Sequence, residues 1–470
     1  MALSGELPLE RYHRASSIGE GTFGSVVTVY NDKGEEYALK LFAKEEETEP
    51  IDLGALREIS CLRLLRGENR HDNIISLVDV QGSSADLDDE DDECGAGTGG
   101  CLGMALPLFS AGSVAGALQE KRLLGLPRRQ KIVFAHGLLS AVAFLHDNGI
   151  LHRDIKSDNV LLKFDENGSY QPVLIDFSLA KPIEITMFQT HDAAEANYNS
   201  NWNLEMESFR HTGEVGTVTY TAPEIFSNHD DDDDDEGPAY GRPVDLYSTG
   251  VVLLEVWQDA LLEAQKNSHA LKQIEAALST MPEKPFPSLL RNLLQVDPEQ
   301  RWTAREALRS DAFAKLNLAE PPVRQLDVSM SLPVDYEEND CISNQCSSNE
   351  AKRKALKRRR LVEKCCHELW YASNGTDDVS LNPMTIPAAL DYASQMEQLE
   401  DELDDLSQST ALLDCVVLAF RFWERETIDL EGLSEHSQGP FADWTLSNYI
   451  ENETTLFLLL DYCLYPRLLR

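Results

Sequence analysis

The segment HRDIKSDN at residues 152–159 restricts the fold of this chain more than any other feature. It places an acid, a cation and an amide close together, at Asp154, Lys156 and Asn159. A carboxylate can accept a proton, an ammonium group can neutralise an anion, and an amide oxygen can bind a hard cation. Each of these tasks needs further groups around the loop, so the flanking segments are expected to supply them in a fixed order.

A glycine-rich run, IGEGTFGSVV at 18–27, lies near the N-terminus. Backbone without Cβ atoms can fold tightly over a triphosphate and present N–H groups to it. The pattern alone is weak, because a nucleotide loop before a helix has the same letters. Here a strand at 25–30 and the sequence YALK at 37–40 follow, and that order favours a kinase over a Rossmann fold. The residues expected at the ATP site are Ile18, Gly19, Gly21, Gly24, Val26, Lys40, Glu58, Pro107 and Phe109.

Lys40 is expected to bind the α- and β-phosphates, and it needs a carboxylate to hold it. The stretch 51–62 is predicted to be helical and offers Glu58. Such a pair acts as an on/off contact, because the phosphates lose their partner when the helix swings out. The segment 102–110 reads as a strand and the hinge between two lobes, where the backbone would bond to adenine.

In the loop at 152–159, Asp154 is expected to accept or orient the proton of a substrate hydroxyl. Lys156 would neutralise charge on the moving γ-phosphate, and a lysine here points to Ser/Thr rather than Tyr acceptors. Asn159 is a predicted Mg²⁺ ligand.

Residues downstream of this loop complete the pattern. Asp176, in the run IDFS, is the predicted second Mg²⁺ ligand, and Ser178 stands where glycine is usual, which is expected to restrict the flip of this segment. Glu224 is predicted to pair with Arg301, and Asp245 is predicted to brace the loop at 152–159, called the catalytic loop below.

These motifs occur in the order typical of eukaryotic protein kinases, and the chain resembles that family. The resemblance implies a bilobal α+β kinase fold over residues 12–316, with ATP and Mg²⁺ as cofactors and proteins as substrates. Because Lys40, Asp154, Asn159 and Asp176 are all present, an active enzyme is expected. The other class left open is a pseudokinase scaffold that recruits partners through acidic loops and a helical tail.

Two segments narrow the resemblance. DLGALREIS at 52–60 is similar to the PSTAIRE-type helix of cyclin-dependent kinases, and HDNIISLVDV at 71–80 is similar to the strand that follows it there. This implies a cyclin partner and a role in cell-cycle or transcriptional control. Thr221 replaces the arginine usual in that family, and Gly216 replaces valine, so proline-directed specificity stays open.

The same resemblance implies two regulatory phosphosites. Thr212 begins TGEVGT, which aligns with the activating segment, so an upstream kinase is expected to phosphorylate it. Thr22 matches an inhibitory site, while Phe23 stands where the neighbouring tyrosine site would be. The cations expected to bind phosphate on Thr212 are Arg57, Arg153 and Lys181.

The chain beyond the kinase region is predicted to hold a linker at 317–350 and a small all-α domain at 351–470. Within it, 411–424 resembles the central helix of a cyclin box and 453–464 the fifth helix. Arg421 and Glu453 fall where cyclins carry the Lys and Glu that contact the kinase. The alternative is a divergent Ser/Thr kinase whose C-terminal helices bind something unrelated. Helices are predicted at 387–399, 409–426 and 448–464.

Charge and composition exclude other classes. The net charge of −40 argues against nucleic-acid binding, and the acidic runs at 86–93 and 230–236 are expected to be solvated insertions. The sequence predicts no signal peptide and no membrane span, which favours the nucleus or the cytoplasm. The basic run at 352–360 is compatible with nuclear import or with a solvated helix face. The nine cysteines lack the spacing of a zinc site.

Overall fold

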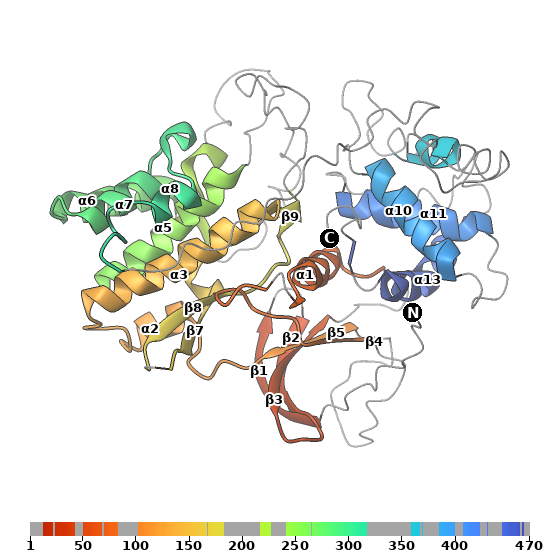
Figure 1. Ribbon diagram of the computed structural model, residues 1–470, viewed down its shortest axis with the longest axis horizontal. Helices are drawn as coiled ribbons and strands as arrows, with labels where there is room; N and C mark the ends of the chain where they lie inside the picture. The colour runs from red at the N-terminus through yellow and green to blue at the C-terminus, as the bar shows by residue number, and fades with distance from the viewer. Residues whose placement is uncertain are drawn as a thin grey trace.

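Figure 1 shows a computed structural model of the chain, in which a twisted sheet, a group of long helices and a separate set of C-terminal helices surround one central helix. The structure describes residues 13–21, 24–42, 50–67, 70–82, 102–166, 168–182, 217–226, 241–264, 266–316, 359–366, 369, 385–399, 408–423, 430, 444–460 and 463–464. The predicted linker at 317–350 and both acidic runs lie outside these residues.

The N-terminal lobe is an antiparallel sheet in the order β1-β2-β3-β5-β4. Alternation of apolar residues buries Val27, Val29 and Leu39 on one face with Ala105. The register pairs Val26 with Lys40 and therefore sets the glycine-rich hairpin above the lysine. The strands are β1 (His13–Gly21), β2 (Gly24–Tyr30), β3 (Glu36–Phe42), β4 (Asp79–Gly82) and β5 (Leu102–Pro107).

Helix α1 (Leu53–Leu64) is the central helix of Figure 1. It begins two residues after the predicted start, because Asp52 caps it: the Asp52 side chain accepts a hydrogen bond from the Ala55 N–H at 3.1 Å. Leu56 and Ile59 are fully buried, and most of the helix is covered. A helix buried on nearly all sides must have neighbours on both flanks, and here they are the kinase lobes and the C-terminal helices (Figure 1).

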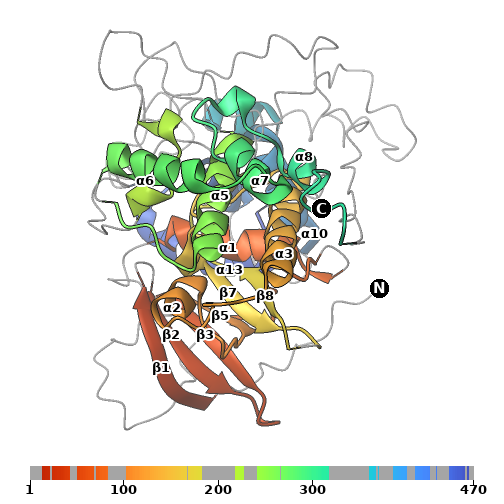
Figure 2. The same cartoon turned by 90° about the vertical axis from the view of Figure 1, so that its left-hand side faces the viewer.

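The C-terminal lobe is built on two long helices, α3 (Arg128–Asp147) and α5 (Arg242–Gln258), which pack on each other and against shorter ones (Figure 2). Both are apolar along most of their length and form the lobe's core. Two short antiparallel strand pairs, β6–β9 and β7–β8, accompany them, and β7 and β8 lie between α3 and the sheet (Figure 1). The remaining elements are α2 (Val114–Gln119), β6 (Ile150–Leu151), β7 (Val160–Phe164), β8 (Tyr170–Leu174), β9 (Lys181–Pro182), α6 (Asn267–Thr280), α7 (Pro285–Leu293) and α8 (Ala304–Leu308).

The C-terminal helices are α10 (Thr385–Leu399), α11 (Gln408–Trp423) and α13 (Leu446–Leu459). α11 packs between α10 and α13, which explains its nearly continuous apolar sequence. α13 ends at Leu459, earlier than the sequence predicted. The structure describes α11 as far as Trp423, and the end of the helix predicted at 409–426 lies outside the described residues. Their buried residues belong to the same hydrophobic cluster as α1 and the kinase core.

The α+β class with two kinase lobes and additional C-terminal helices is confirmed. Among the described helices, the longest apolar stretches are too short or too polar to cross a bilayer.

Candidate active site

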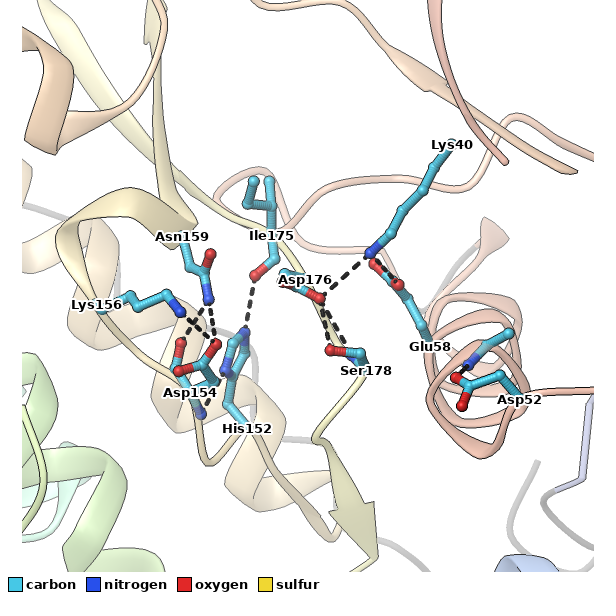
Figure 3. A network of polar contacts seen from close by, with 11 residues as sticks. Lys40, Asp52, Glu58, His152, Asp154, Lys156, Asn159, Ile175, Asp176 and Ser178 are labelled. Carbon is cyan, nitrogen blue, oxygen red and sulfur yellow. Dashed lines mark hydrogen bonds and ion pairs between the residues drawn. The ribbon is translucent and has the colours of Figure 1, made fainter. Parts of the chain in front are cut away.

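The site brings together side chains from β3, α1, the loop at 152–159 and the segment at 175–178 (Figure 3). Lys40 on β3 donates to Glu58 Oε2 on α1 at 2.6 Å, and its Nζ lies 3.4 Å from Asp176 Oδ1. Burial by itself would lower the pKa of Lys40, but these two carboxylates outweigh burial and raise it, so the amine is cationic. Burial raises the pKa of Glu58 and Lys40 opposes the rise, so the charge of Glu58 depends on Lys40.

Asp176 faces the lysine from the other side of the site. Its backbone is left-handed, at φ 65°, a conformation that residues other than glycine adopt sparsely. The Ser178 hydroxyl donates to Asp176 Oδ1 at 2.8 Å. Burial would raise the pKa of Asp176, but Lys40 and Ser178 lower it below the usual value of a carboxyl, so it is an anion.

The catalytic loop gathers a second polar group (Figure 3). Lys156 Nζ lies 3.0 Å from Asp154 Oδ2, and the Asn159 side-chain amide donates to the same oxygen at 2.7 Å and to the Asp154 carbonyl at 2.8 Å. Both amide hydrogens of Asn159 are thereby used, which leaves its side-chain oxygen as the acceptor. Burial raises the pKa of Asp154 against the lowering effect of Lys156, which suits a group that receives a proton.

Asp245 at the start of α5 holds this loop by its backbone. Its Oδ1 accepts from the Arg153 N–H at 2.8 Å and its Oδ2 from the His152 N–H at 2.9 Å. The same Oδ2 lies 2.9 Å from His146 Nε2. The His152 ring in turn lies 3.0 Å from the Ile175 carbonyl, which links the loop to the residue before Asp176.

Glu224 and Arg301 are joined as the sequence predicted. Arg301 donates to both carboxylate oxygens of Glu224, at 2.7 and 2.9 Å, and also to the Pro243 and Gln295 carbonyls, at 2.8 Å each. Its side chain is fully buried, so this bidentate pair fixes the turn at Pro223–Ile225, which follows the segment of Thr212, to the helical core.

The remaining predicted nucleotide contacts border the same region. Gly21 pairs with Gly24 at the tip of the β1–β2 hairpin, and Gly19 pairs with Val26. Ile18 on β1 is 51% exposed and so has an open apolar surface. Pro107 ends β5, and Phe109, just beyond it, packs on the core as a partly buried residue.

Both predicted phosphosites, Thr212 and Thr22, lie outside the described residues. The three cations proposed to receive phosphate are described: Arg57 and Lys181 are buried at 6% and 4% exposure, and Arg153 has a left-handed backbone at φ 69°. They come from α1, β9 and the catalytic loop.

The C-terminal helices reach the active-site helix through Arg421 on α11 and Glu453 on α13. The two side chains form a buried ion pair, and Glu453 Oε2 accepts from the Ile51 N–H at 2.6 Å. Arg421 donates to the Ile51 carbonyl at 2.7 Å. Tyr449, which the sequence did not single out, donates to Glu453 Oε1 at 2.7 Å. The partner on the kinase side is backbone, and no side-chain pattern could have indicated it.

A second contact joins the C-terminal segment to the middle of α1. The Leu464 N–H donates to Ser60 Oγ at 3.3 Å, and Cys463 Sγ lies 3.9 Å from the Ser60 carbonyl. Tyr392 on α10 donates to the Leu464 carbonyl and thereby holds the segment in place. Nothing in the sequence indicated this contact.

A third set of contacts, around the buried Glu255 carboxylate, was not predicted from the sequence. Ser157 in the catalytic loop donates to the buried Glu255 carboxylate on α5, and Tyr220 donates to the same carboxylate at 3.0 Å. The Leu262 N–H completes the set at 2.8 Å. This network ties the loop to the segment before Glu224. Burial raises the pKa of Glu255 to about 7, against the lowering effect of these hydrogen bonds.

The residues present fit Mg²⁺ bound to a nucleotide. Within the described parts of the chain, His, Cys, Asp and Glu side chains form no cluster of three that could hold a metal without help. Asn159 and Asp176 instead offer one neutral and one anionic oxygen. Because Mg²⁺ is commonly bound by one or two carboxylates together with substrate phosphates, this small set suits it.

A lysine held by a helix carboxylate, an opposing aspartate and a braced acid–lysine–amide loop together define a protein kinase. Residues 12–313 match the family described as protein kinase domain, and the chain belongs to that family. It is similar to cyclin-dependent kinase 9 of Homo sapiens, with 26% identity over 352 residues that cover 71% of this chain and 82% of that protein. Cyclin-dependent kinase 9 of Bos taurus is 28% identical over 346 residues, covering 64% and 80%. These relatives support a eukaryotic kinase of the cyclin-dependent type.

Proposed function

We propose that this chain transfers the γ-phosphate of ATP to serine or threonine hydroxyls of protein substrates, and that its own C-terminal helices replace a separate cyclin. The observation that carries the proposal is the unbroken path of contacts from Glu453 through Ile51 and α1 to the Glu58–Lys40 pair. A helix held just before its start and at its middle in this way keeps the pair closed without any other chain.

In this proposal Lys40 binds the α- and β-phosphates, and Asp154 orients the attacking hydroxyl and receives its proton. Lys156, 3.0 Å from Asp154, neutralises charge on the γ-phosphate as it moves. When bound through Asn159 and Asp176, Mg²⁺ would neutralise the phosphate oxygens. Lys156 also supports Ser/Thr over Tyr acceptors, because this position is a lysine in kinases of the former class.

The two contacts on α1 support the in-cis activator. Arg421 and Glu453 bind both polar groups of Ile51, just before the helix, and Leu464 binds Ser60 within it. Together they allow α1 little freedom to rotate or slide. Linking a partner to its target in one chain raises its effective concentration to about millimolar for short flexible linkers, so a weak interface suffices.

The decisive experiment measures phosphate transfer by the purified full-length chain with Mg²⁺, ATP and a generic Ser/Thr substrate, with no cyclin added. Activity is expected without a partner, and Glu453→Ala should lose it while still binding nucleotide. If the chain is active but Glu453→Ala is equally active, the helices serve another purpose and the in-cis activator is wrong.

Asp154→Asn addresses the alternative of a pseudokinase scaffold. It should abolish transfer and leave ATP binding intact, since Asp154 acts on the hydroxyl and not on the nucleotide. A full-length chain that binds ATP without measurable transfer, with or without the substitution, would favour the scaffold.

Phosphorylation of Thr212 by an upstream kinase would complete activation. Arg57, Arg153 and Lys181 come from three separate elements, and one dianion between them would order the activation segment. Thr212→Ala should therefore lower activity. The similarity to cyclin-dependent kinases supports a role in transcriptional or cell-cycle control, in the nucleus or the cytoplasm; a tagged chain followed by microscopy would locate it.

A further inference from the structure

Ser178 occupies the position that is usually glycine in this motif, and it contacts the metal-binding aspartate directly (Figure 3). Its hydroxyl donates to Asp176 Oδ1 at 2.8 Å, and its backbone N–H lies 3.4 Å from the same oxygen. The serine is 1% exposed, so water does not compete for the hydroxyl.

The contact determines which oxygen of Asp176 remains for a cation. A carboxylate rotates easily about χ2, because that torsion has broad wells. Oδ1 is held by Ser178 on one side and by Lys40, 3.4 Å away, on the other. With the Ser178 hydroxyl, the Ser178 N–H and Lys40 all on Oδ1, these contacts oppose the rotation and leave Oδ2 as the oxygen available to a metal.

The backbone of the segment favours the same arrangement. Asp176 is left-handed at φ 65°, and Ser178 is not among the described non-glycine residues with positive φ. A serine therefore fits here without strain, whereas glycine would add access to conformations that a residue with a Cβ avoids. Phe177 is fully buried and its ring lies 4.8 Å from the His152 ring. The same His152 ring lies 3.0 Å from the Ile175 carbonyl, so the segment is fixed on both sides of the aspartate.

We propose that Ser178 is a positioning residue that holds the Asp176 carboxylate in its metal-binding orientation and prevents the Asp176–Phe177 segment from turning outward. Two properties of serine contribute: the hydroxyl fixes the carboxylate, and the Cβ restricts the backbone. The inference rests on the proposed function only in that Mg²⁺-nucleotide is the ligand.

Two substitutions separate these contributions. Ser178→Ala removes the hydroxyl and keeps the Cβ, and Ser178→Gly removes both and restores the residue usual in the motif. Ser140→Ala is the matched control, because Ser140 is a buried serine whose hydroxyl bonds to His71 at 3.0 Å, away from the site.

The probe is ADP, titrated into the full-length chain by calorimetry at several free Mg²⁺ concentrations. Ser178→Ala should raise the Mg²⁺ needed for half-maximal binding roughly 10- to 100-fold, as expected from one lost hydrogen bond to a charged group, with metal-free ADP affinity unchanged. Ser178→Gly should show at least that shift and, in addition, faster amide hydrogen exchange across residues 176–180. Ser140→Ala should match the parent in both measurements.

Equal Mg²⁺ dependence in the parent and both Ser178 variants would overturn the inference. An ADP affinity of the parent that does not change with the Mg²⁺ concentration would also overturn it. A shift of the same size in Ser140→Ala would also overturn it, because the effect would then be general loosening. If the parent transfers no phosphate but Ser178→Ala still weakens Mg²⁺-dependent ADP binding, the positioning role stands and the proposed function fails.

Discussion

Glu453 accepts a hydrogen bond from the backbone N–H of Ile51 at 2.6 Å, although the two residues are 402 positions apart. Arg421, paired with Glu453, donates to the carbonyl of the same residue at 2.7 Å. One buried ion pair thus binds both the N–H and the carbonyl of Ile51, the residue two positions before α1 begins. A change in either side chain should therefore alter the Glu58–Lys40 contact, because Glu58 lies about two turns further along that helix.

Glu453→Ala should leave Arg421 buried without its carboxylate. Removing one member of a buried pair typically costs about 3–5 kcal/mol, enough to release the C-terminal helices from α1. Kinase activity should fall at least about tenfold, since 1.4 kcal/mol corresponds to that factor. The measurement is kcat/KM for ATP together with amide exchange in residues 53–64.

Arg359→Ala is the control for that experiment. Arg359 pairs with Glu363 at 2.7 Å, but both side chains are about one-third exposed, and surface pairs are worth about 0–1 kcal/mol. Activity should be unchanged. A comparable loss in both variants would contradict a specific role for the Glu453 contact.

Lys40→Met removes the cation that Glu58 and Asp176 share. With no ammonium nearby, burial keeps the pKa of Glu58 raised, and the carboxyl should become neutral. A charge-assisted hydrogen bond contributes about 1.5–3 kcal/mol, so kcat/KM for ATP should fall roughly 10- to 100-fold. Lys131→Met, which breaks a buried pair with Asp259 in the C-terminal lobe, should lower the melting temperature and spare the ATP dependence.

Arg301→Ala tests the tie between the activation segment and the core. The substitution leaves Glu224 and the carbonyls of Pro243 and Gln295 without their donor. Breaking this buried pair should lower the free energy of unfolding by about 3–5 kcal/mol. The melting temperature in scanning calorimetry should therefore fall by roughly 5–15 °C. Arg305→Ala, which breaks a more exposed pair, should lower it by only a few degrees; equal shifts would show that burial does not decide the effect.

His71 gives the chain an acid-sensitive point. Burial lowers its pKa to about 4, while an exposed histidine in the unfolded chain titrates near about 6.5. Because the unfolded state binds the proton first, stability falls as the pH drops from about 6.5 to about 4, by up to about 3 kcal/mol. The His71→Asn variant should melt at a lower temperature than the parent at pH 7. Its stability should fall less than that of the parent between pH 7 and pH 5. A parallel decline in both proteins would assign the acid sensitivity to other groups.

Much of the site was predictable because its parts follow in a fixed order along the chain. Lys40 with Glu58, Glu224 with Arg301, and Asp245 beneath the catalytic loop are pairs in which each member belongs to a recognisable local motif. The two lobes followed from the same order. The start of α1 was predicted less accurately. The helix begins at Leu53 because Asp52 is its N-cap, and only the structure shows the hydrogen bond from Ala55 that identifies the cap.

The unpredicted contacts share a physical cause. Ile51 and Leu464 act through backbone groups, which every residue has, so their side chains carry no signal. Ser60 and Ser157 are ordinary in a helix and a loop, and their partners lie far away in the sequence. Ser178 was visible as a departure from glycine, but its hydroxyl contact with Asp176 needed coordinates.

The hydrogen bond between Leu464 and Ser60 spans 404 positions, and this has a consequence for synthesis. A ribosome adding about 5–20 residues per second finishes the kinase lobes many seconds before it reaches Leu464. Throughout that interval α1 has neither of its C-terminal partners. If the C-terminal helices activate the kinase as proposed, the nascent enzyme is dormant until the segment that carries Leu464 arrives, so that translation itself times the onset of activity.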